Sequence, residues 1–252
     1  MWMTAFKEAG VAIMAGDPDR AEQLAAAAFE MGTETGQPDA FAIYGSQLMY
    51  VRLQQGRLGE MVSLIEQAVA ENPGIPAFRP ILASAHLEAG NDVTALGLLD
   101  SAAADGFASL SPDFVWMMGV TSYAVVAVEL RATGAAQRLF DLLVSYRGQI
   151  PFIGTLGLFP VAVALGGLAS VLGRYDEAEA FFAEADELNG RGELKYSAAY
   201  TELWCGHMLA LRGGSDRLGR SKLLLERARA SAATHGYSGI ERRAAVELSD
   251  LS

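Results

Sequence analysis

Cysteine is almost absent from this sequence, and histidine is rare. Among 252 residues there are one cysteine, Cys205, and three histidines, His86, His207 and His235. A single cysteine excludes an internal disulfide, and no cluster of His and Cys has the spacing of metal ligands. We therefore expect a chain that needs neither an oxidising compartment nor a metal or other cofactor, with the cytoplasm as its location.

The common sequence signatures of catalysis are also missing. The chain has no Gly-x-Ser-x-Gly elbow, no His-Glu-x-x-His helix and no Gly-rich phosphate loop that ends in Gly-Lys-Ser/Thr. Cys205 and His207 lie close in sequence, but side chains two residues apart on a helix point about 200° apart and cannot share a metal. We expect Cys205 to pack against a neighbouring helix and His207 to face the inner surface without a catalytic role. The protein is therefore predicted not to be an enzyme.

Positive charge is scarce and unevenly distributed. With 19 Lys and Arg against 30 Asp and Glu, the net charge is −11, which disfavours direct nucleic-acid binding and acidic membrane surfaces. Residues 1–190 hold 9 basic and 23 acidic side chains, whereas residues 191–252 hold 10 and 7. This basic C-terminal segment is either a solvated helix face or a docking surface for an acidic partner, which includes the acidic part of a second copy. Its basic residues include Arg217, Arg220, Lys222, Arg227, Arg229, Arg242 and Arg243.

One long run, residues 148–173, is uncharged. Its length would suffice for a membrane helix, but Pro151 and Pro160 divide it, which predicts a shorter buried helix from about Pro160 to Leu172. At the N-terminus, Lys7 and Glu8 stand where a secretory signal needs apolar residues. The sequence therefore predicts neither a membrane span nor a signal peptide.

Glycines punctuate the chain at a regular spacing. Breaks recur every 34 to 44 residues, which is the period of a helical repeat protein. Amphipathic stretches follow the breaks: in residues 175–188, Ala178, Phe182, Ala185 and Leu188 fall on one helical face. The breaks are Gly16-Asp17, Gly56-Arg57, Gly90-Asn91, Gly134-Ala135, Gly173-Arg174 and Gly213-Gly214.

A second helix fits before each later break. Asp17-Pro18 and Ser111-Pro112 each supply an N-cap side chain followed by a proline in the first helical position. The β-branched run 123–128 lies within a window of helix length, so no strand is expected. About a dozen antiparallel helices are therefore predicted, and those that precede the breaks are Asp39–Gln55, Pro80–Ala89, Pro112–Ala132, Pro160–Leu172 and Tyr196–Arg212.

The stretch 172–185, LGRYDEAEAFFAEA, resembles the second half of a tetratricopeptide repeat (TPR). Gly173 stands at the turn, and Ala178, Phe182 and Ala185 give the small, large, small alternation of that motif. Leu165-Gly166-x-x-Ala169 resembles its first half, and Cys205-Gly206 is the same element 40 residues later. Small residues let paired helices approach closely, while the large one fills the gap to the next pair. The resemblance implies an all-α, right-handed α-solenoid of about six antiparallel helix pairs with a C-terminal capping helix, in a single domain over residues 1–252.

A second resemblance covers nearly the whole chain. The motifs that carry it are Gln37-Pro38-Asp39-Ala40, Tyr44-Gly45-x-Gln47-Leu48, Gln55-Gly56-Arg57, Ala68-Val-Ala-Glu-Asn-Pro-Gly74, Asp105-Gly106-Phe107 and Gly173-Arg-Tyr-Asp-Glu-Ala178. They resemble the C-terminal repeat region of large bacterial signalling proteins. In those proteins the repeats adjoin a nucleotide-binding ATPase module with a class III nucleotide cyclase or a LuxR-type DNA-binding domain, and this chain shows the signature of none of them. The resemblance implies a regulatory setting rather than catalysis.

The two ends of the chain lead to further expectations. Met1-Trp2-Met3-Thr4-Ala5-Phe6 is apolar, as expected for a fragment whose preceding domain is missing, and it offers an edge for homodimerisation. In residues 240–251, Ile240, Ala244, Leu248 and Leu251 lie on one side and charged residues on the other, which is typical of a solenoid cap. The chain is therefore expected to be a C-terminal fragment.

Two functional hypotheses remain open. The first is a protein-protein interaction and regulatory scaffold whose concave surface binds a protein, a peptide, or the ATPase, cyclase or DNA-binding domain of its own parent chain. The second is a small-molecule or peptide sensor that controls such a domain, which predicts a closed apolar pocket instead of an open groove. By repeat register, the concave surface is expected to hold Tyr50, Leu53, Glu88, Arg131, Tyr200, Leu203 and His207.

Overall fold

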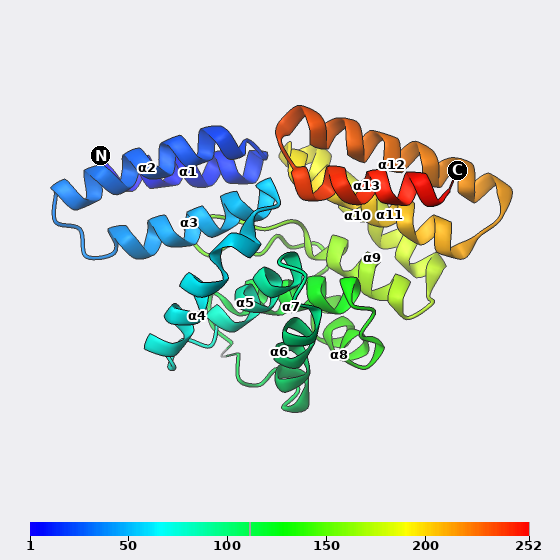
Figure 1. The fold of residues 1–252 in the computed structure, drawn as a ribbon, viewed down its shortest axis with the longest axis horizontal. Coiled ribbons are helices and arrows are strands. Elements are labelled where there is room, and N and C mark those ends of the chain that lie inside the picture. Colours follow the sequence, from blue (N-terminus) through cyan, green and yellow to red (C-terminus); the bar gives the residue numbers. More distant parts are fainter. Residues whose placement is uncertain (111, 252) are drawn as a thin grey trace.

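The fold is all-helical. The structure, a computed structural model, describes residues 1–110 and 112–251, which form thirteen α-helices joined by turns (Figure 1). Within these ranges there is no strand, only an isolated bridge between Phe152 and Gly157 in a loop. The predicted all-α class and the expectation of about a dozen helices are therefore confirmed.

The helix boundaries are as follows. The first half of the chain contains α1 (Trp2–Ala15), α2 (Pro18–Glu34), α3 (Ala40–Gln55), α4 (Val62–Glu71), α5 (Phe78–Glu88) and α6 (Asp92–Ala104), with a 3₁₀ turn, η1 (Leu58–Met61), before α4. The second half contains α7 (Trp116–Glu129), α8 (Thr133–Leu143), α9 (Val161–Val171), α10 (Tyr175–Gly192), α11 (Lys195–Arg212), α12 (Ser215–His235) and α13 (Ser238–Asp250), with a 3₁₀ turn, η2 (Val144–Tyr146), after α8.

Left-handed residues end helices at five of the six predicted glycine breaks. Gly16, Gly56, Gly90, Gly173 and Gly213 all have φ between 67° and 76°. The break predicted at Gly134 is wrong, because Gly134 lies inside α8 and the left-handed residue is Arg131, with φ 51°. The amide of Ala132 donates to the carbonyl of Ala127, which repeats the pattern that closes α9 around Gly173. Arg131 therefore occupies a position that the other breaks give to glycine.

The predicted helix starts differ in outcome. The Asp17 side chain accepts a hydrogen bond from the amide of Arg20 at 3.2 Å, and Pro18 is the first residue of α2, as predicted. In the second signal, Ser111 lies outside the described residues. The proline that follows it does not begin a helix, because α7 starts only at Trp116.

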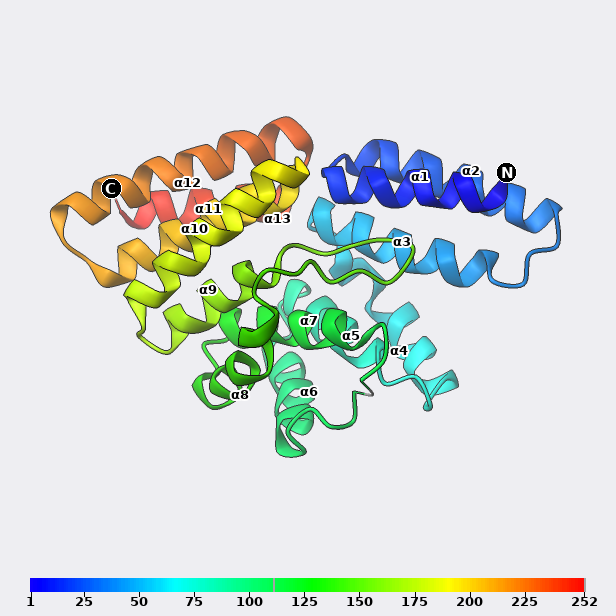
Figure 2. The ribbon, with the colours of Figure 1, turned by 180° about the vertical axis from the view of Figure 1, so that it is seen from behind.

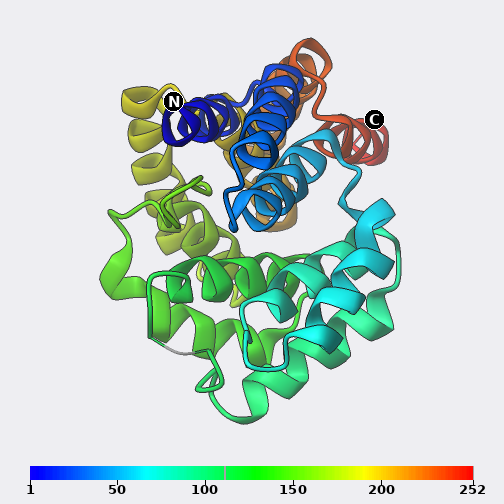
Figure 3. The same ribbon diagram turned by 90° about the vertical axis from the view of Figure 1, so that its left-hand side faces the viewer.

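Helices that follow each other in sequence pack as neighbours over most of the chain. Odd-numbered helices also contact the next odd-numbered one, from α5 to α7 and on through α9 and α11 to α13. The two ends of this row then meet, because α1 contacts α11 and α3 contacts α13 (Figures 1 and 3). At this junction the Tyr237 hydroxyl donates to the Gly16 carbonyl, and Gly56 lies against the backbone of Gly239. The row of helices therefore closes on itself.

The uncharged run forms a loop followed by α9. The loop crosses to the first helices (Figure 2), where Leu156 is fully buried against α1 and α3. The Gln47 side-chain amide donates to the carbonyls of Phe6, at 2.6 Å, and Thr155, at 3.3 Å. Residues 161–169 of α9 are all buried, as expected for a helix that is apolar on every side. None of the helices in the described ranges has the length and hydropathy that a membrane span requires.

Glycine lets neighbouring helices approach closely at the positions that carried the repeat pattern. A Cβ on Gly166 would lie 2.6 Å from the ring of Phe182 on α10, and one on Gly206 would lie 2.9 Å from Leu225 on α12. Each glycine therefore faces the helix that follows its own, which gives a steric reason for Leu165-Gly166 and Cys205-Gly206.

Candidate ligand-binding cleft

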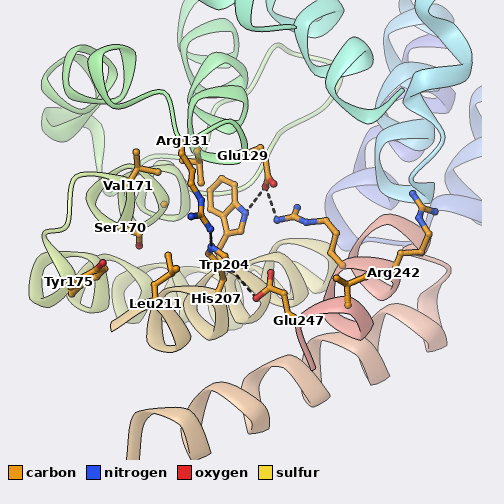
Figure 4. Close-up of a pocket in the computed structure, with 14 residues that line it drawn as sticks. Glu129, Arg131, Ser170, Val171, Tyr175, Trp204, His207, Leu211, Arg242 and Glu247 are labelled. Atoms are coloured by element: carbon orange, nitrogen blue, oxygen red, sulfur yellow. Dashed lines mark hydrogen bonds and ion pairs between the residues drawn. The ribbon is translucent and has the colours of Figure 1, made fainter. Parts of the chain in front are cut away.

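A cleft of about 610 Å³ opens where α7, α9, α11 and α13 come together (Figure 4). We call it the Trp204 cleft, after the residue at its floor. Residues 128–131 and 167–175 lie along one side, and residues 242–247 of α13 lie along the other. Its volume is in the range of sites that bind small molecules or short peptide segments.

Two glycines of α9 make the floor possible. A Cβ on Gly167 would lie 2.6 Å from the Trp204 ring and 2.9 Å from a Val128 methyl group, so only glycine admits the indole at this position. The adjacent Gly166 makes room for Phe182 on another side of the same helix. Trp204 is buried, with 3% of its surface exposed, and forms a rigid base for the cleft.

Glu129 is the polar centre of the cleft. Its Oε1 accepts hydrogen bonds from Trp204 Nε1 at 2.8 Å and from the Tyr200 hydroxyl at 3.3 Å, and Arg243 Nη2 lies 2.8 Å from the same oxygen. Burial, together with the Glu129 charge, raises the pKa of Tyr200 well above its usual value, so this phenol remains a neutral donor. Glu129 is the last residue of α7, and its side chain therefore links this helix to α11 and α13.

His207 bridges the two sides. Its Nδ1 lies 3.0 Å from Glu247 Oε2 on α13, and its Nε2 lies 3.3 Å from Arg131 Nη2 in the turn after α7. Arginine can only donate, so Nε2 accepts and the Nδ1 proton points at Glu247 in this arrangement. Both ring nitrogens are therefore occupied by neighbouring side chains.

The remaining walls are apolar, with two further cations near the rim. Val171, Leu211 and Val246 line the cleft, and Leu211 and Val246 are 45% and 61% exposed. Arg131 and Arg242 are exposed, and neither forms an ion pair with a carboxylate among the described residues. The cleft thus combines an apolar interior with two exposed guanidinium groups, of which Arg242 also acts on the Glu88 carboxyl group in the adjoining cavity.

The structure places the residues expected on the concave surface in three different surroundings. Arg131 and His207, which lie 76 positions apart, meet in the Trp204 cleft. Leu53, Glu88 and Tyr200 line an adjoining cavity of about 250 Å³, which shares Glu129, Arg242 and Arg243 with the cleft. The other two, Tyr50 and Leu203, belong to the buried core, with 7% and 0% of their surface exposed.

Glu88 is the most perturbed carboxyl group in the adjoining cavity. Burial raises its pKa to about 7, against the opposing effect of the Gly59 amide, which donates to Glu88 Oε2 at 2.9 Å. The group therefore changes its charge near neutral pH at the place where α5 meets η1.

Several cleft residues were not identified from the sequence. Trp204 was not among the residues expected on the concave surface, Arg242 and Arg243 were interpreted as part of the basic segment, and Glu247 belongs to the charged side of the predicted cap. Glu129 was not singled out, although it is the one charged residue in the sequence of α7. A lone carboxylate in a buried apolar helix needs a partner, and this signal could have identified it.

The other polar residues of interest lie elsewhere. Cys205 is half-buried on α11, and burial raises the pKa of its thiol to about 12, as expected for a packing residue. Part of the basic segment is paired within the chain, and no metal-binding group of three His, Cys, Asp or Glu occurs in the described ranges. The ion pairs are Arg212 with Asp176, Arg220 with Glu179, Arg227 with Glu202 and Arg243 with Glu129.

Comparisons with family models, with curated proteins and with solved structures found no match for this chain. The function proposed below therefore rests on the residues of the Trp204 cleft and on the sequence resemblance.

Proposed function

We propose that the chain is a non-enzymatic, TPR-like interaction module that binds a peptide segment of a partner protein in the Trp204 cleft. The observation that carries the proposal is the open, apolar cleft of about 610 Å³ on a floor fixed by Trp204 and Glu129. An extended segment enters an open groove without any rearrangement of the helices, and fixed polar groups at the floor orient it.

The helix packing supports the solenoid part of the proposal. Sequential pairing, with contacts from one odd-numbered helix to the next from α5 onward, is typical of a right-handed α-solenoid whose inner surface is formed by one helix of each pair. In the setting that the resemblance implies, the partner is an ATPase, cyclase or DNA-binding domain of a cytoplasmic bacterial regulator. The capping helix α13 then contributes one wall of the binding site.

The state of the polar groups favours binding over catalysis. His207 has both ring nitrogens engaged, and the Ser170 hydroxyl donates to the Gly166 carbonyl at 2.7 Å. Glu129 is held by Trp204 and Arg243. A general base needs a free lone pair aimed at the substrate, and the Nε2 lone pair of His207 is directed to Arg131 instead. The Ser170 proton is directed to a backbone carbonyl rather than to a base that could activate the hydroxyl.

A sensor of a small molecule or peptide is the second candidate function. It is favoured by the position of α13, which lines the cleft and also contacts α3 at the junction where the row of helices closes. A ligand against α13 would then bias the junction if its affinity differed between the closed and open arrangements. The openness of the cleft favours the first function, because the sensor hypothesis predicts an enclosed apolar pocket.

Selection from a displayed library of random octapeptides tests the proposal. The wild-type protein is used for selection, and Val246→Trp, which fills the cleft from an exposed position, is used for counter-selection. Val93→Trp is the matched control, since Val93 on α6 is 87% exposed and outside the cleft. We expect peptides that bind the wild type and Val93→Trp but not Val246→Trp. Equal enrichment on all three proteins would refute the proposed site.

A further inference from the structure

The charges in the Trp204 cleft are only partly balanced within the chain. Arg243 pairs with Glu129 at 2.8 Å, and Glu247 pairs with His207 at 3.0 Å. Glu129 is thus paired with a cation, whereas Glu247 accepts the Nδ1 proton of His207. Against these two carboxylates the cleft lining holds three arginines, Arg131, Arg242 and Arg243, so an excess of positive charge remains.

Arg131 and Arg242 are the cations that remain. Arg131 donates to His207 Nε2, a neutral acceptor in this arrangement. Arg242 forms no ion pair with a described carboxylate, and the acidic group on which it acts is Glu88 in the adjoining cavity, whose pKa burial raises and Arg242 lowers. Figure 4 shows the two arginines on either side of Glu129. Arg131 is also held in a left-handed backbone conformation, which costs about 1 kcal/mol or more for a residue other than glycine. The chain thus presents two guanidinium groups, spaced across one cleft, that can accept carboxylates from outside.

Between these cations the lining is apolar. Val171, Leu211 and Val246 contribute hydrocarbon surface, and the latter two are substantially exposed. A ligand that satisfies the whole site therefore needs an apolar group in the middle and negative charge toward both ends. A compound with one carboxylate can pair with only one of the two arginines at a time.

We infer that the Trp204 cleft recognises an acidic peptide segment in which carboxylates flank an apolar side chain. This inference rests on the proposed function and names the chemistry of its ligand. The apolar side chain lies against Val171, Leu211 and Val246, and the flanking carboxylates pair with Arg131 and Arg242. Charge complementarity at this site selects the segment, because residues 1–190 hold 23 acidic against 9 basic side chains and disfavour acidic partners over most of the chain.

Binding of defined fluorescent octapeptides tests the inference. Three probes share a central Leu-Phe pair and differ only in their flanks, which are Asp, Ser or Lys, and octanoate serves as a competitor with a single carboxylate. We expect the Asp probe to bind most tightly by fluorescence anisotropy. Arg131→Gln and Arg242→Gln should each weaken it about two- to fivefold, and the double variant about tenfold.

Arg229→Gln is the matched control, since Arg229 is an exposed arginine of α12 outside the cleft. It should leave the affinity for the Asp probe unchanged. The advantage of the wild type over Arg131→Gln should shrink when salt rises from about 0.1 M to about 1 M, where the screening length falls from about 10 Å to about 3 Å.

The outcomes separate the inference from the function on which it rests. If the Ser or Lys probe binds as tightly as the Asp probe, and Val246→Trp abolishes that binding, the cleft is a peptide site and the inference about acidity is wrong. If the Asp probe binds Val246→Trp as tightly as the wild type, the proposed site itself is wrong. Displacement of the peptide by octanoate at comparable concentrations would show that the cleft binds a small carboxylate, and the inferred peptide ligand would then be wrong.

Discussion

Helices α9 and α1 show two ways of burying an apolar helix in one protein. In α9, residues 161–169 are all buried between neighbouring helices, and glycines admit the rings of Phe182 and Trp204. In α1, burial is confined to one face, while Met3 and Val11 are 60% and 67% exposed. The comparison teaches that the Trp204 cleft stands on the most completely packed part of the chain, whereas α1 is held along one side.

The largest expected difference concerns the core of α9. Leu165→Ala should lower the free energy of unfolding by about 2–5 kcal/mol, because the removed atoms leave a cavity that neighbours on every side cannot fill. Val11→Ala on the exposed face of α1 should change it by no more than about 0.5 kcal/mol. Urea denaturation measures both. Similar losses of unfolding free energy for the two variants would contradict the proposed difference in packing between α9 and α1.

Titration of Glu88 tests the burial at the end of α5, a helix that lies between α1 and α9 in the chain. Its raised pKa means that the folded protein binds this proton more tightly than the unfolded chain. The stabilisation that protonated Glu88 gives to the folded state is therefore complete below the unfolded pKa of 4.5. It is lost as the pH rises through the folded pKa of about 7. Relative to wild type, Glu88→Gln should remove about 1–3 kcal/mol of this pH dependence. Parallel stability profiles for the two proteins would show that Glu88 titrates normally.

The floor of the cleft gives a smaller, matched test. Gly167→Ala places a Cβ 2.6 Å from Trp204 and should cost about 1–3 kcal/mol. Gly97→Ala on α6 adds a Cβ with nothing within 4 Å and should stabilise the protein by up to about 1 kcal/mol through helix propensity. Thermal unfolding of both variants gives the comparison, and a stabilising Gly167→Ala would show that the floor is loose.

The smallest effect is expected at the junction where α1 contacts α11 and the row of helices closes. Gly16 and Gly36 both have left-handed φ, but a Cβ on Gly16 would contact Tyr196 and Tyr237, whereas Gly36 has open space. Gly16→Ala should therefore cost about 1–2 kcal/mol more than Gly36→Ala, since both incur the same backbone strain. Equal costs would indicate that the row of helices does not close in solution.

The helices were predictable from the sequence because their signals are local. Asp17-Pro18 begins α2, and left-handed glycines end α1, α3 and α9. The break at Gly134 was wrong, because an arginine accepts the strained backbone three residues earlier. Propensity favours glycine at such a position but does not require it.

The cleft was predictable only in part. Arg131 and His207 follow from repeat register, since each is placed on an inner helix or at its end. The contributions of Arg242 and Glu247 do not follow, because they depend on how far the row of helices bends before α13 returns toward α7. That bend is the sum of small rotations between pairs, which no sequence period contains.

The most direct test of the central claim is an NMR titration of the indole N–H signals with the Asp-flanked octapeptide. The chain has three tryptophans, of which Trp204 forms the floor of the cleft and donates to Glu129. A Trp204→Phe variant assigns its signal. We predict that the Trp204 signal shifts to saturation while those of Trp2 and Trp116 stay in place. An unmoved Trp204 signal with bound peptide would contradict the account, because the ligand would then occupy another surface.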